Sequence, residues 1–398
     1  SFGIIIPYYA HDICTQKDRL RVLRESVILV VRDYNRIIDS LPANEKGLFI
    51  EAIDNLNKTL IPGLSKIRWT SDNGMSESFL KACEKRCGDV YNLVMMVRNQ
   101  KKVIEEKCSK ISETHLLRVE KNVYEKGSFE EAQLSHRSDK VTFLEKTFME
   151  IKAILNIVFD SFRTERFEVI KAWVDFLHSI DNTLESSLKK SAKGSLLELS
   201  KAITGDAKTN PTLLFKVYPI LDEEKKAIDF DPKVTYLHEM IRKATNTMVD
   251  ILLHVPKMEK VILEEREIER QQEEATREQE EKNAKRPGMA GSRLPKRPIN
   301  SNDPKKPGEM GEDFTEKGII EKRLKTLTGS PSFHEIIAKD KDIDGILKAI
   351  FKRIKACTAK VEDETKKWTK HRNLWEADKE KAVRRIDRGN PNLRVYKD

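Results

Sequence analysis

The sequence predicts an all-α protein, an elongated succession of helical bundles with long coiled-coil-like helices and one charged flexible insert. Two observations predict this fold class. Apolar residues recur at spacings of three and four along most of the chain, as the buried face of a helix requires. Charged residues make up 35% of the 398 residues and apolar residues only 38%, a balance typical of long amphipathic helices.

The first predicted helix covers residues 17–40, and a second begins near residue 44. Leu41-Pro42 is expected to end the first helix, and Pro62-Gly63 the second, because proline lacks an amide hydrogen and glycine permits an unusual turn. The short connection predicts an antiparallel hairpin. The apolar stripe of the first helix consists of Leu20, Leu23, Val27, Val31, Tyr34 and Ile38.

The most regular pattern lies in residues 83–111 and follows heptad spacing. It predicts a helix of roughly 35 residues with coiled-coil-like packing. Cys83 and Cys87 share this face, and we interpret them as small core residues because no third ligand for a metal accompanies them. The apolar positions are Cys83, Cys87, Val90, Val94, Val97, Ile104, Cys108 and Ile111.

No strong helix breaker interrupts residues 130–193, which predicts one long helix or two in line, ending at Gly194 or Gly205. The less regular residues 213–219 are expected to be extended or to form a short turn. Another helix is predicted over residues 234–254.

A final long helix is predicted to carry an apolar stripe from Ile343 to Trp375 and to end at Gly389-Asn390-Pro391. The resulting organisation has four parts. These are a first bundle (1–126), a second bundle (127–257), a charged insert (258–313) and a third bundle (314–398).

The charged insert changes sign along its length. Residues 264–281 hold nine acidic and three basic residues, and they are expected to form a solvent-exposed helix or nothing stable. Residues 282–306 are basic and rich in proline, which predicts a flexible arm. The arm could bind an acidic surface such as a tubulin tail, or it could be a spacer kept soluble by charge. Its candidate binding residues are Lys285, Arg286, Arg293, Lys296, Arg297, Lys305 and Lys306.

Catalytic and cofactor motifs are missing from the sequence. There is no Gly-Lys dipeptide for a phosphate-binding loop, and no GxGxxG, GxSxG or HExxH. The eight histidines are isolated, and the five cysteines suggest neither a disulfide framework nor a zinc site. We therefore expect no enzyme activity, cofactor or metal in this segment.

The charge and hydropathy pattern also argues against two kinds of partner. The net charge of +9 comes from 74 basic against 65 acidic residues without a nucleic-acid-binding motif, so we expect no nucleic acid. The most apolar window, residues 26–31, is flanked by charges and is much shorter than the roughly 20 residues that cross a bilayer, so we expect no membrane.

Residues 60–71 resemble the tail region of dynein heavy chains. Further landmarks follow in the family's order over nearly the whole chain, but the resemblance identifies none in residues 264–311. The landmark residues are Tyr34, Pro62, Gly63, Leu64, Trp69, Trp173, Pro256, Trp368 and Trp375.

The resemblance implies a non-catalytic stretch in the C-terminal part of the tail, before the linker, within a longer heavy chain. The implied partners are intermediate chains, light chains, other heavy chains and docking factors on the doublet microtubule. ATP would bind only in the downstream motor domain. Residues 61–71 are closest to ciliary members, which indicates an axonemal location and an outer-arm type. A helical tethering protein of spectrin-like type is the alternative, and the sequence following residue 398 would distinguish the two.

Overall fold

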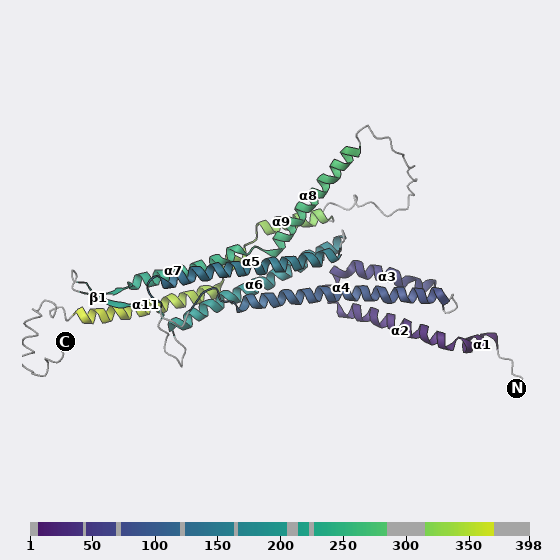
Figure 1. Cartoon of the computed structure of the whole chain (residues 1–398), viewed down its shortest axis with the longest axis horizontal. Coiled ribbons are helices and arrows are strands. Elements are labelled where there is room, and N and C mark those ends of the chain that lie inside the picture. The colour runs from purple at the N-terminus through teal and green to yellow at the C-terminus, as the bar shows by residue number, and fades with distance from the viewer. Residues whose placement is uncertain are drawn as a thin grey trace, which may run out of the picture. The chain divides into compact units, whose positions relative to one another are not determined.

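The computed structural model describes residues 7–42, 45–68, 73–119, 124–162, 166–204, 214–222, 227–284 and 315–369. Nearly all elements in these ranges are helices, and one short β-hairpin accompanies them (Figure 1). The predicted all-α class is confirmed. No helix in the described ranges combines the length and apolar character needed to cross a membrane.

The chain divides into two compact units, each assembled from three separate stretches of sequence. The first comprises residues 1–108, 148–184 and 257–330, and the second comprises residues 109–147, 185–256 and 331–398. This division follows contacts in space and not the order of the chain. The four consecutive parts predicted from the sequence remain a prediction.

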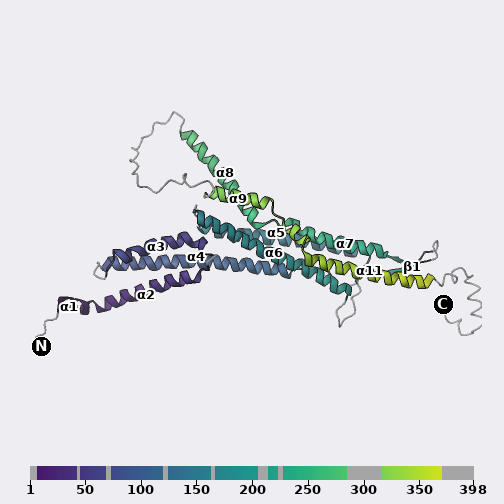
Figure 2. The ribbon, with the colours of Figure 1, turned by 180° about the vertical axis from the view of Figure 1, so that it is seen from behind.

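The first unit contains five complete α-helices and one 3-10 turn within the described residues. They are α1 (Tyr8–Thr15), α2 (Lys17–Ser40), η1 (Lys46–Phe49), α3 (Ile50–Ser65), α8 (Met258–Ala284) and α9 (Glu316–Thr328), joined by parts of α4 (Asn73–Glu113), α5 (Ser128–Phe162) and α6 (Phe167–Thr204). Both α2 and α3 lie along α4, as the front and rear views show (Figure 1, Figure 2).

The heptad pattern of α4 predicted its buried face correctly. The helix has 41 residues, and none of the eight predicted positions exposes more than 4% of its surface. Burial raises the pKa of the Cys87 and Cys108 thiols to about 11 and also raises that of Cys83. These cysteines are therefore core residues, as predicted.

The bounds predicted for α2 are confirmed, but its predicted stripe was wrong in part. The buried positions are Leu23, Val30 and Ile37, whereas Val27 and Val31 are 37% and 52% exposed. Residues 26–31 are mostly apolar at consecutive positions, so the spacing alone does not single out one face. The three buried residues lie seven positions apart, a spacing typical of coiled-coil-like packing. The same packing was predicted for α4.

The predicted end of α3 at Pro62-Gly63 was also wrong, because Pro62 lies inside the last turn and the helix continues to Ser65. A proline has no backbone N–H to donate, but its carbonyl can still accept a hydrogen bond from the next turn. The Pro62 carbonyl accepts hydrogen bonds from the amides of Lys66 (2.8 Å) and Ile67 (3.1 Å).

Helices α5 and α6 form an antiparallel hairpin, so both predicted alternatives, one continuous helix and two helices in line, were wrong. The Trp173 ring, near the start of α6, lies 5.4 Å from the Phe159 ring and 6.5 Å from the Phe162 ring at the end of α5. The second helix passes through Gly194 and ends at Thr204, immediately before Gly205.

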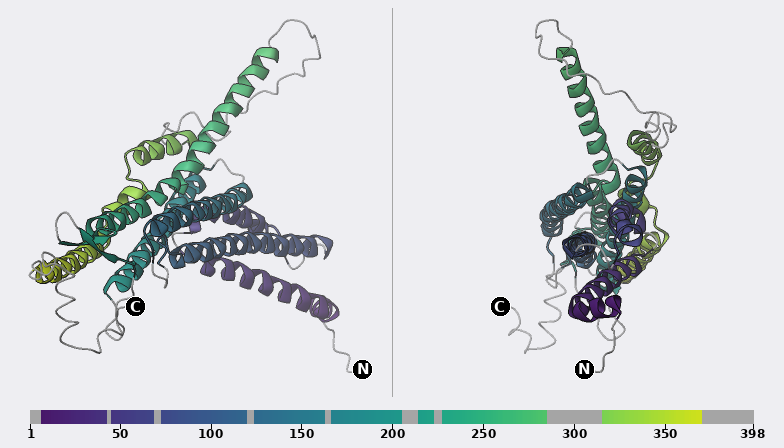
Figure 3. Two further views of the ribbon diagram at one scale, coloured as in Figure 1. Left: turned by 60° about the vertical axis from the view of Figure 1, so that its left-hand side comes forward. Right: turned by 90° about the vertical axis from the view of Figure 1, so that its right-hand side faces the viewer.

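Helix α8 begins at Met258 and includes the acid-rich residues 264–281, so the helical alternative is confirmed there. Its distal part extends away from the other helices of its unit (Figure 3), and residues 271–279 are all exposed. Helix α9 packs against α8, and Arg266 Nε donates to Glu316 Oε1 at 3.2 Å.

The second unit adds a β-hairpin and shorter helices to the remaining parts of α4, α5 and α6. Its elements are β1 (Tyr218–Asp222), β2 (Ala227–Asp231), α7 (Val234–Asp250), η2 (Ile251–His254), α10 (Phe333–Ala338) and α11 (Lys341–Thr369). The strands are antiparallel, with Ile220 opposite Asp229. The predicted helix over residues 234–254 is confirmed as α7 and η2. On α11, Ile343 and Ile350 are buried, but Cys357, an apolar position within the stripe predicted from Ile343 to Trp375, is exposed.

Candidate interaction surface

The most deeply buried charged side chains form a structural joint between three helices of the first unit. Asp181 on α6 is 4% exposed, and its carboxylate accepts hydrogen bonds from the amides of Met258 (2.8 Å) and Glu259 (3.1 Å). These are the first amides of α8, so a side chain of another helix caps α8. Burial raises the pKa of the Asp181 carboxyl to about 7, against the opposing effect of these two amide hydrogen bonds.

Glu259 completes this joint, and its residue surface is wholly buried. Its carboxylate accepts from Arg323 Nε and, at 3.1 Å, from Arg323 Nη2, and it lies 3.3 Å from His178 Nδ1. The hydrogen bond to Glu259 raises the pKa of Arg323. Because every one of these groups is paired, the cluster fastens α8 and α9 to α6. Across the described ranges, no group of three His, Cys, Asp or Glu residues could hold a metal ion.

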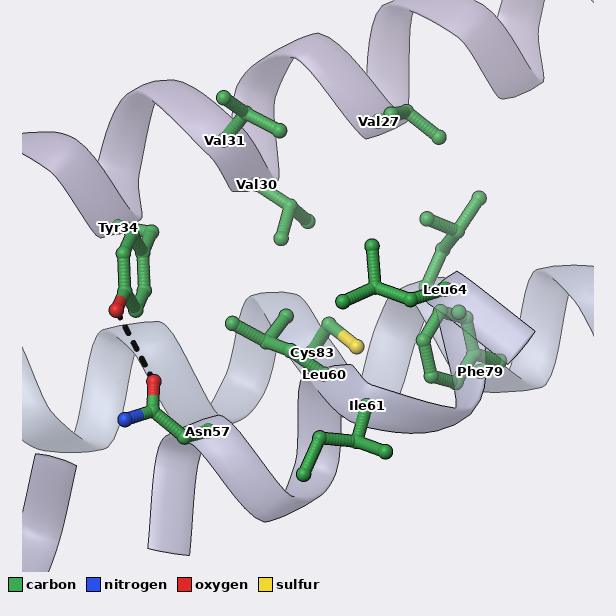
Figure 4. A pocket seen from close by; sticks show the side chains of 12 residues that line it. Val27, Val30, Val31, Tyr34, Asn57, Leu60, Ile61, Leu64, Phe79 and Cys83 are labelled. Carbon is green, nitrogen blue, oxygen red and sulfur yellow. Dashed lines mark hydrogen bonds between the residues drawn. The ribbon is translucent and has the colours of Figure 1, made fainter. Parts of the chain in front are cut away.

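The first unit also contains an apolar groove of about 570 Å³ between α2, α3 and α4. The residues of all three helices point into it (Figure 4). We call this site the α2–α3–α4 groove. It is lined by Val27, Val30, Val31, Tyr34, Asn57, Leu60, Ile61, Gly63, Leu64, Phe79, Leu80 and Cys83.

Tyr34 and Asn57 are the only side chains of this lining that carry N or O atoms, and they are paired with each other. Tyr34 Oη donates to Asn57 Oδ1 at 3.0 Å (Figure 4). The bond links α2 to α3 at one side of the groove. The remaining lining is apolar apart from the Cys83 thiol, so the groove is suited to apolar side chains and not to a polar substrate.

Gly63 allows α3 to approach α4 closely at this groove. A Cβ atom on Gly63 would lie 2.7 Å from Cζ of Phe79, which is shorter than a van der Waals contact. The neighbouring Leu64 is 89% exposed and Ile61 is 55% exposed. Contiguous apolar exposure of this kind marks interaction sites in soluble proteins.

The structure brings together only some of the predicted landmark residues. Tyr34, Gly63 and Leu64 line the groove beside Pro62 of the same helix turn. Trp173 is a core residue, 2% exposed, and Pro256 precedes the joint at the start of α8. Trp368 lies in α11, but its side chain, Trp69, Trp375 and all seven basic arm residues lie outside the described residues.

The groove itself was not among the predicted features. The feature of the sequence that could have indicated the groove is the apolar run of residues 26–31, which gives α2 apolar side chains on more than one face. A helix that is apolar all round is normally buried, so the run indicated a second packing partner beyond α4.

Comparison with known proteins places this sequence in a family. The family model "Dynein heavy chain, N-terminal region 1" matches residues 1–79. The Chlamydomonas reinhardtii protein "Dynein-1-beta heavy chain, flagellar inner arm I1 complex" is 27% identical over 398 residues, which cover 99% of this chain and 8% of that protein. The human "Dynein axonemal heavy chain 2" is 32% identical over 283 residues, 69% of this chain and 6% of that protein. The chain belongs to the dynein heavy chain family.

This dynein heavy chain segment therefore spans less than a tenth of the relatives that it matches. The mouse "Dynein axonemal heavy chain 2" is 33% identical over 258 residues. The matched family model describes the N-terminal tail region of the heavy chain and not its motor ring, and it includes all groove residues except Leu80 and Cys83. The one relative named here whose name specifies an arm is an inner-arm heavy chain, so it lends no support to the predicted outer-arm type.

Proposed function

We propose that this segment is a non-catalytic scaffold in the tail of an axonemal dynein heavy chain and that it transmits force along the tail. The observation that carries the proposal is α4, a helix of 41 residues with a buried apolar position at nearly every heptad step. Such a helix is roughly 60 Å long and resists bending when its seam is packed. Long packed helices of this kind suit a load-bearing part.

The proposed partners are intermediate chains, light chains, other heavy chains and docking factors at the doublet microtubule. The proposed location is the axoneme of a cilium or flagellum, in keeping with the flagellar and axonemal names of the relatives. ATP hydrolysis and movement along microtubules would be activities of the motor domain elsewhere in the heavy chain. Similarity along 99% of the chain favours this role over a spectrin-like tether.

A tagged heavy chain in ciliated cells tests the scaffold role. We expect it to lie along axonemes and, after high-salt extraction, to sediment in one complex with other dynein subunits. A matched heavy chain lacking residues 7–369 should retain ATPase activity in its motor domain but sediment without those subunits. A tagged chain found only outside cilia, or a deletion that leaves subunit association unchanged, would contradict the proposal.

We further propose that the basic arm, residues 282–306, binds acidic surfaces, with tubulin tails as the tested case. Replacing Lys285, Arg286, Arg293, Lys296, Arg297, Lys305 and Lys306 with Gln should lower cosedimentation of the chain with microtubules at low salt. The unmodified chain should lose the same binding when salt is raised. Equal binding of the two chains at low salt would show that the arm is a spacer.

A further inference from the structure

We propose that Ser330 is a phosphorylation site for a protein kinase that requires proline after its acceptor, and that Lys257 holds the resulting phosphate. Such a modification would add regulation to the proposed scaffold. Its test does not depend on the scaffold role, so the two proposals fail separately.

The sequence offers this class of kinase one acceptor. Ser330 precedes Pro331, and this is the only Ser-Pro or Thr-Pro pair in the 398 residues, although the chain contains 14 prolines. Proline also biases the residue before it away from helical geometry and toward an extended backbone. An extended backbone is the conformation in which protein kinases bind their substrates.

Ser330 lies in the connection between α9, which ends at Thr328, and α10, which begins at Phe333. Ser330 is half-buried, whereas residues 329, 331 and 332 are exposed. A Cβ atom on Gly329 would meet no atom within 4 Å, so there is open space beside the acceptor. A kinase can therefore reach this connection without unfolding either helix.

The Ser330 hydroxyl makes two hydrogen bonds. It donates to the Leu327 carbonyl at 2.9 Å and accepts from Nζ of Lys257 at 3.1 Å. Phosphorylation would remove the first bond, but the Ser330 amide also donates to the Leu327 carbonyl, at 3.1 Å. The end of α9 thus keeps a hydrogen bond to this carbonyl after the modification.

Lys257 is the cation that the phosphate would meet. It forms no ion pair with the residues that the structure describes, and its charge acts on Asp181 from beyond salt-bridge distance. The nearest carboxylates have other partners, since Asp181 accepts from the amides of Met258 and Glu259, and Glu259 accepts from Arg323. A phosphate of charge roughly −2 would therefore gain a charge-assisted hydrogen bond from this ammonium group.

The two residues mark the ends of one stretch of the first unit. This stretch, residues 257–330, contains α8 and α9, and the chain belongs to the second unit on either side of it. The hydrogen bond between Lys257 and Ser330 therefore closes the stretch at its base. A phosphate would turn this bond into an ion pair and tighten the closure.

The chemical step is a phosphoryl transfer from ATP bound to the kinase. The Ser330 oxygen forms a bond to the γ-phosphorus as the bond from that phosphorus to the β–γ bridging oxygen breaks. ADP leaves, and an aspartate of the kinase accepts the hydroxyl proton.

Incubation of the full 398-residue chain with a purified proline-directed kinase and ATP tests the site. We expect peptide mass spectrometry to find one phosphate, on Ser330. Ser330→Ala should abolish its incorporation, and Pro331→Ala should do the same. Ser332→Ala is the matched control and should keep it, because the Ser332 hydroxyl accepts from the Glu335 amide and no proline follows it.

A synthetic peptide of residues 323–337 shows whether the folded chain presents the acceptor. The chain should be phosphorylated within about tenfold of the rate of the peptide, since only a local opening is needed. Phosphorylation mainly at another residue, or a rate more than about a hundredfold below that of the peptide, would overturn the proposal.

Hydrogen exchange followed by mass spectrometry tests the role of Lys257. Phosphorylation should slow exchange in the last turn of α9 about threefold, the effect of a partly exposed ion pair. Lys257→Met keeps an apolar side chain without the charge and should remove this slowing. Lys317→Met, in the first turn of α9, is the control and should retain it. Equal slowing in Lys257→Met, or none in the original chain, would refute the assignment of the phosphate to Lys257.

Discussion

Asp181 is a carboxyl group that caps a helix other than its own. Its contacts with the amides of Met258 and Glu259 attach the start of α8 to α6. The charged groups near it are Lys257 and Glu259 at the start of α8 and Arg323 of α9, whose own pKa Asp181 helps to raise. Burial outweighs the favourable contacts and raises the pKa of this carboxyl to about 7.

A pH-dependent stability follows from this raised pKa. The native state holds the Asp181 proton more tightly than the unfolded state does, so its contribution to stability is present below about pH 4 and is lost as pH rises toward 7. Asp181→Asn removes this dependence. Its destabilisation in urea unfolding should therefore be larger at pH 5 than at pH 8, by no more than about 3 kcal/mol. The exposed Asp160→Asn is the control, and an equal cost of Asp181→Asn at both pH values would contradict the assignment.

Gly63 and Gly88 are two helical glycines with opposite surroundings. A Cβ at Gly63 would meet the Phe79 ring at 2.7 Å, while a Cβ at Gly88 meets nothing within 4 Å. Gly63→Ala should lower the free energy of unfolding by about 1–3 kcal/mol through overpacking. Gly88→Ala should raise it by about 0.5–1 kcal/mol, because alanine favours the helix. Chemical denaturation of both variants checks this, and a stabilising Gly63→Ala would show that the Phe79 ring moves away freely.

At the scale of elements, the α5–α6 hairpin is held at its closed end by Trp173. Its ring packs against Phe159, Phe162 and Phe176 at centroid distances of 5.4, 6.5 and 5.6 Å. These four rings join the last turns of α5 to the first turns of α6. These aromatic contacts stabilise the closed end of the hairpin.

Removing this ring should therefore destabilise the first unit. We expect Trp173→Ala to cost about 3–5 kcal/mol in the free energy of unfolding, since it leaves a cavity among the remaining rings. Trp173→Phe keeps an aromatic contact and should cost clearly less. Urea denaturation followed by circular dichroism measures both, and near-equal costs would mean that ring packing is not what holds the hairpin.

For the whole molecule, residues 285–314, which follow α8, are expected to be separable from the folded units. The contacts between α8 and α9 are made by Arg266, Glu316, Glu259 and Arg323, all outside residues 285–314. Replacing residues 285–314 with a Gly/Ser linker of equal length should leave the thermal midpoint of unfolding within about 2 °C of the original. A destabilisation of about 1 kcal/mol would lower the midpoint by more than that. A much larger drop would show that the insert contributes to the fold.

Particular elements show how far the sequence predicts this molecule. The α4 seam was predicted at all eight positions, because a heptad repeat allows one buried face only. The α2 face was predicted in part, since an uninterrupted apolar run has no unique period. The groove was not predicted at all. Its residues come from three helices, and Tyr34, Leu64 and Phe79 become neighbours only when those helices pack.

By itself, the sequence determined the helical class, the bounds of α2, the core face of α4 and the resemblance to dynein tails, because these depend on local periodicity and on ordered landmarks along the chain. Only the tertiary structure decided that α5 and α6 fold back on each other, that Asp181 caps α8, and that an exposed apolar groove lies between α2, α3 and α4. The physical reason is the distance along the sequence between the residues that interact. Helix formation depends on residues three and four apart, whereas a joint or a groove depends on side chains many tens of residues apart, which only the packing of helices brings together.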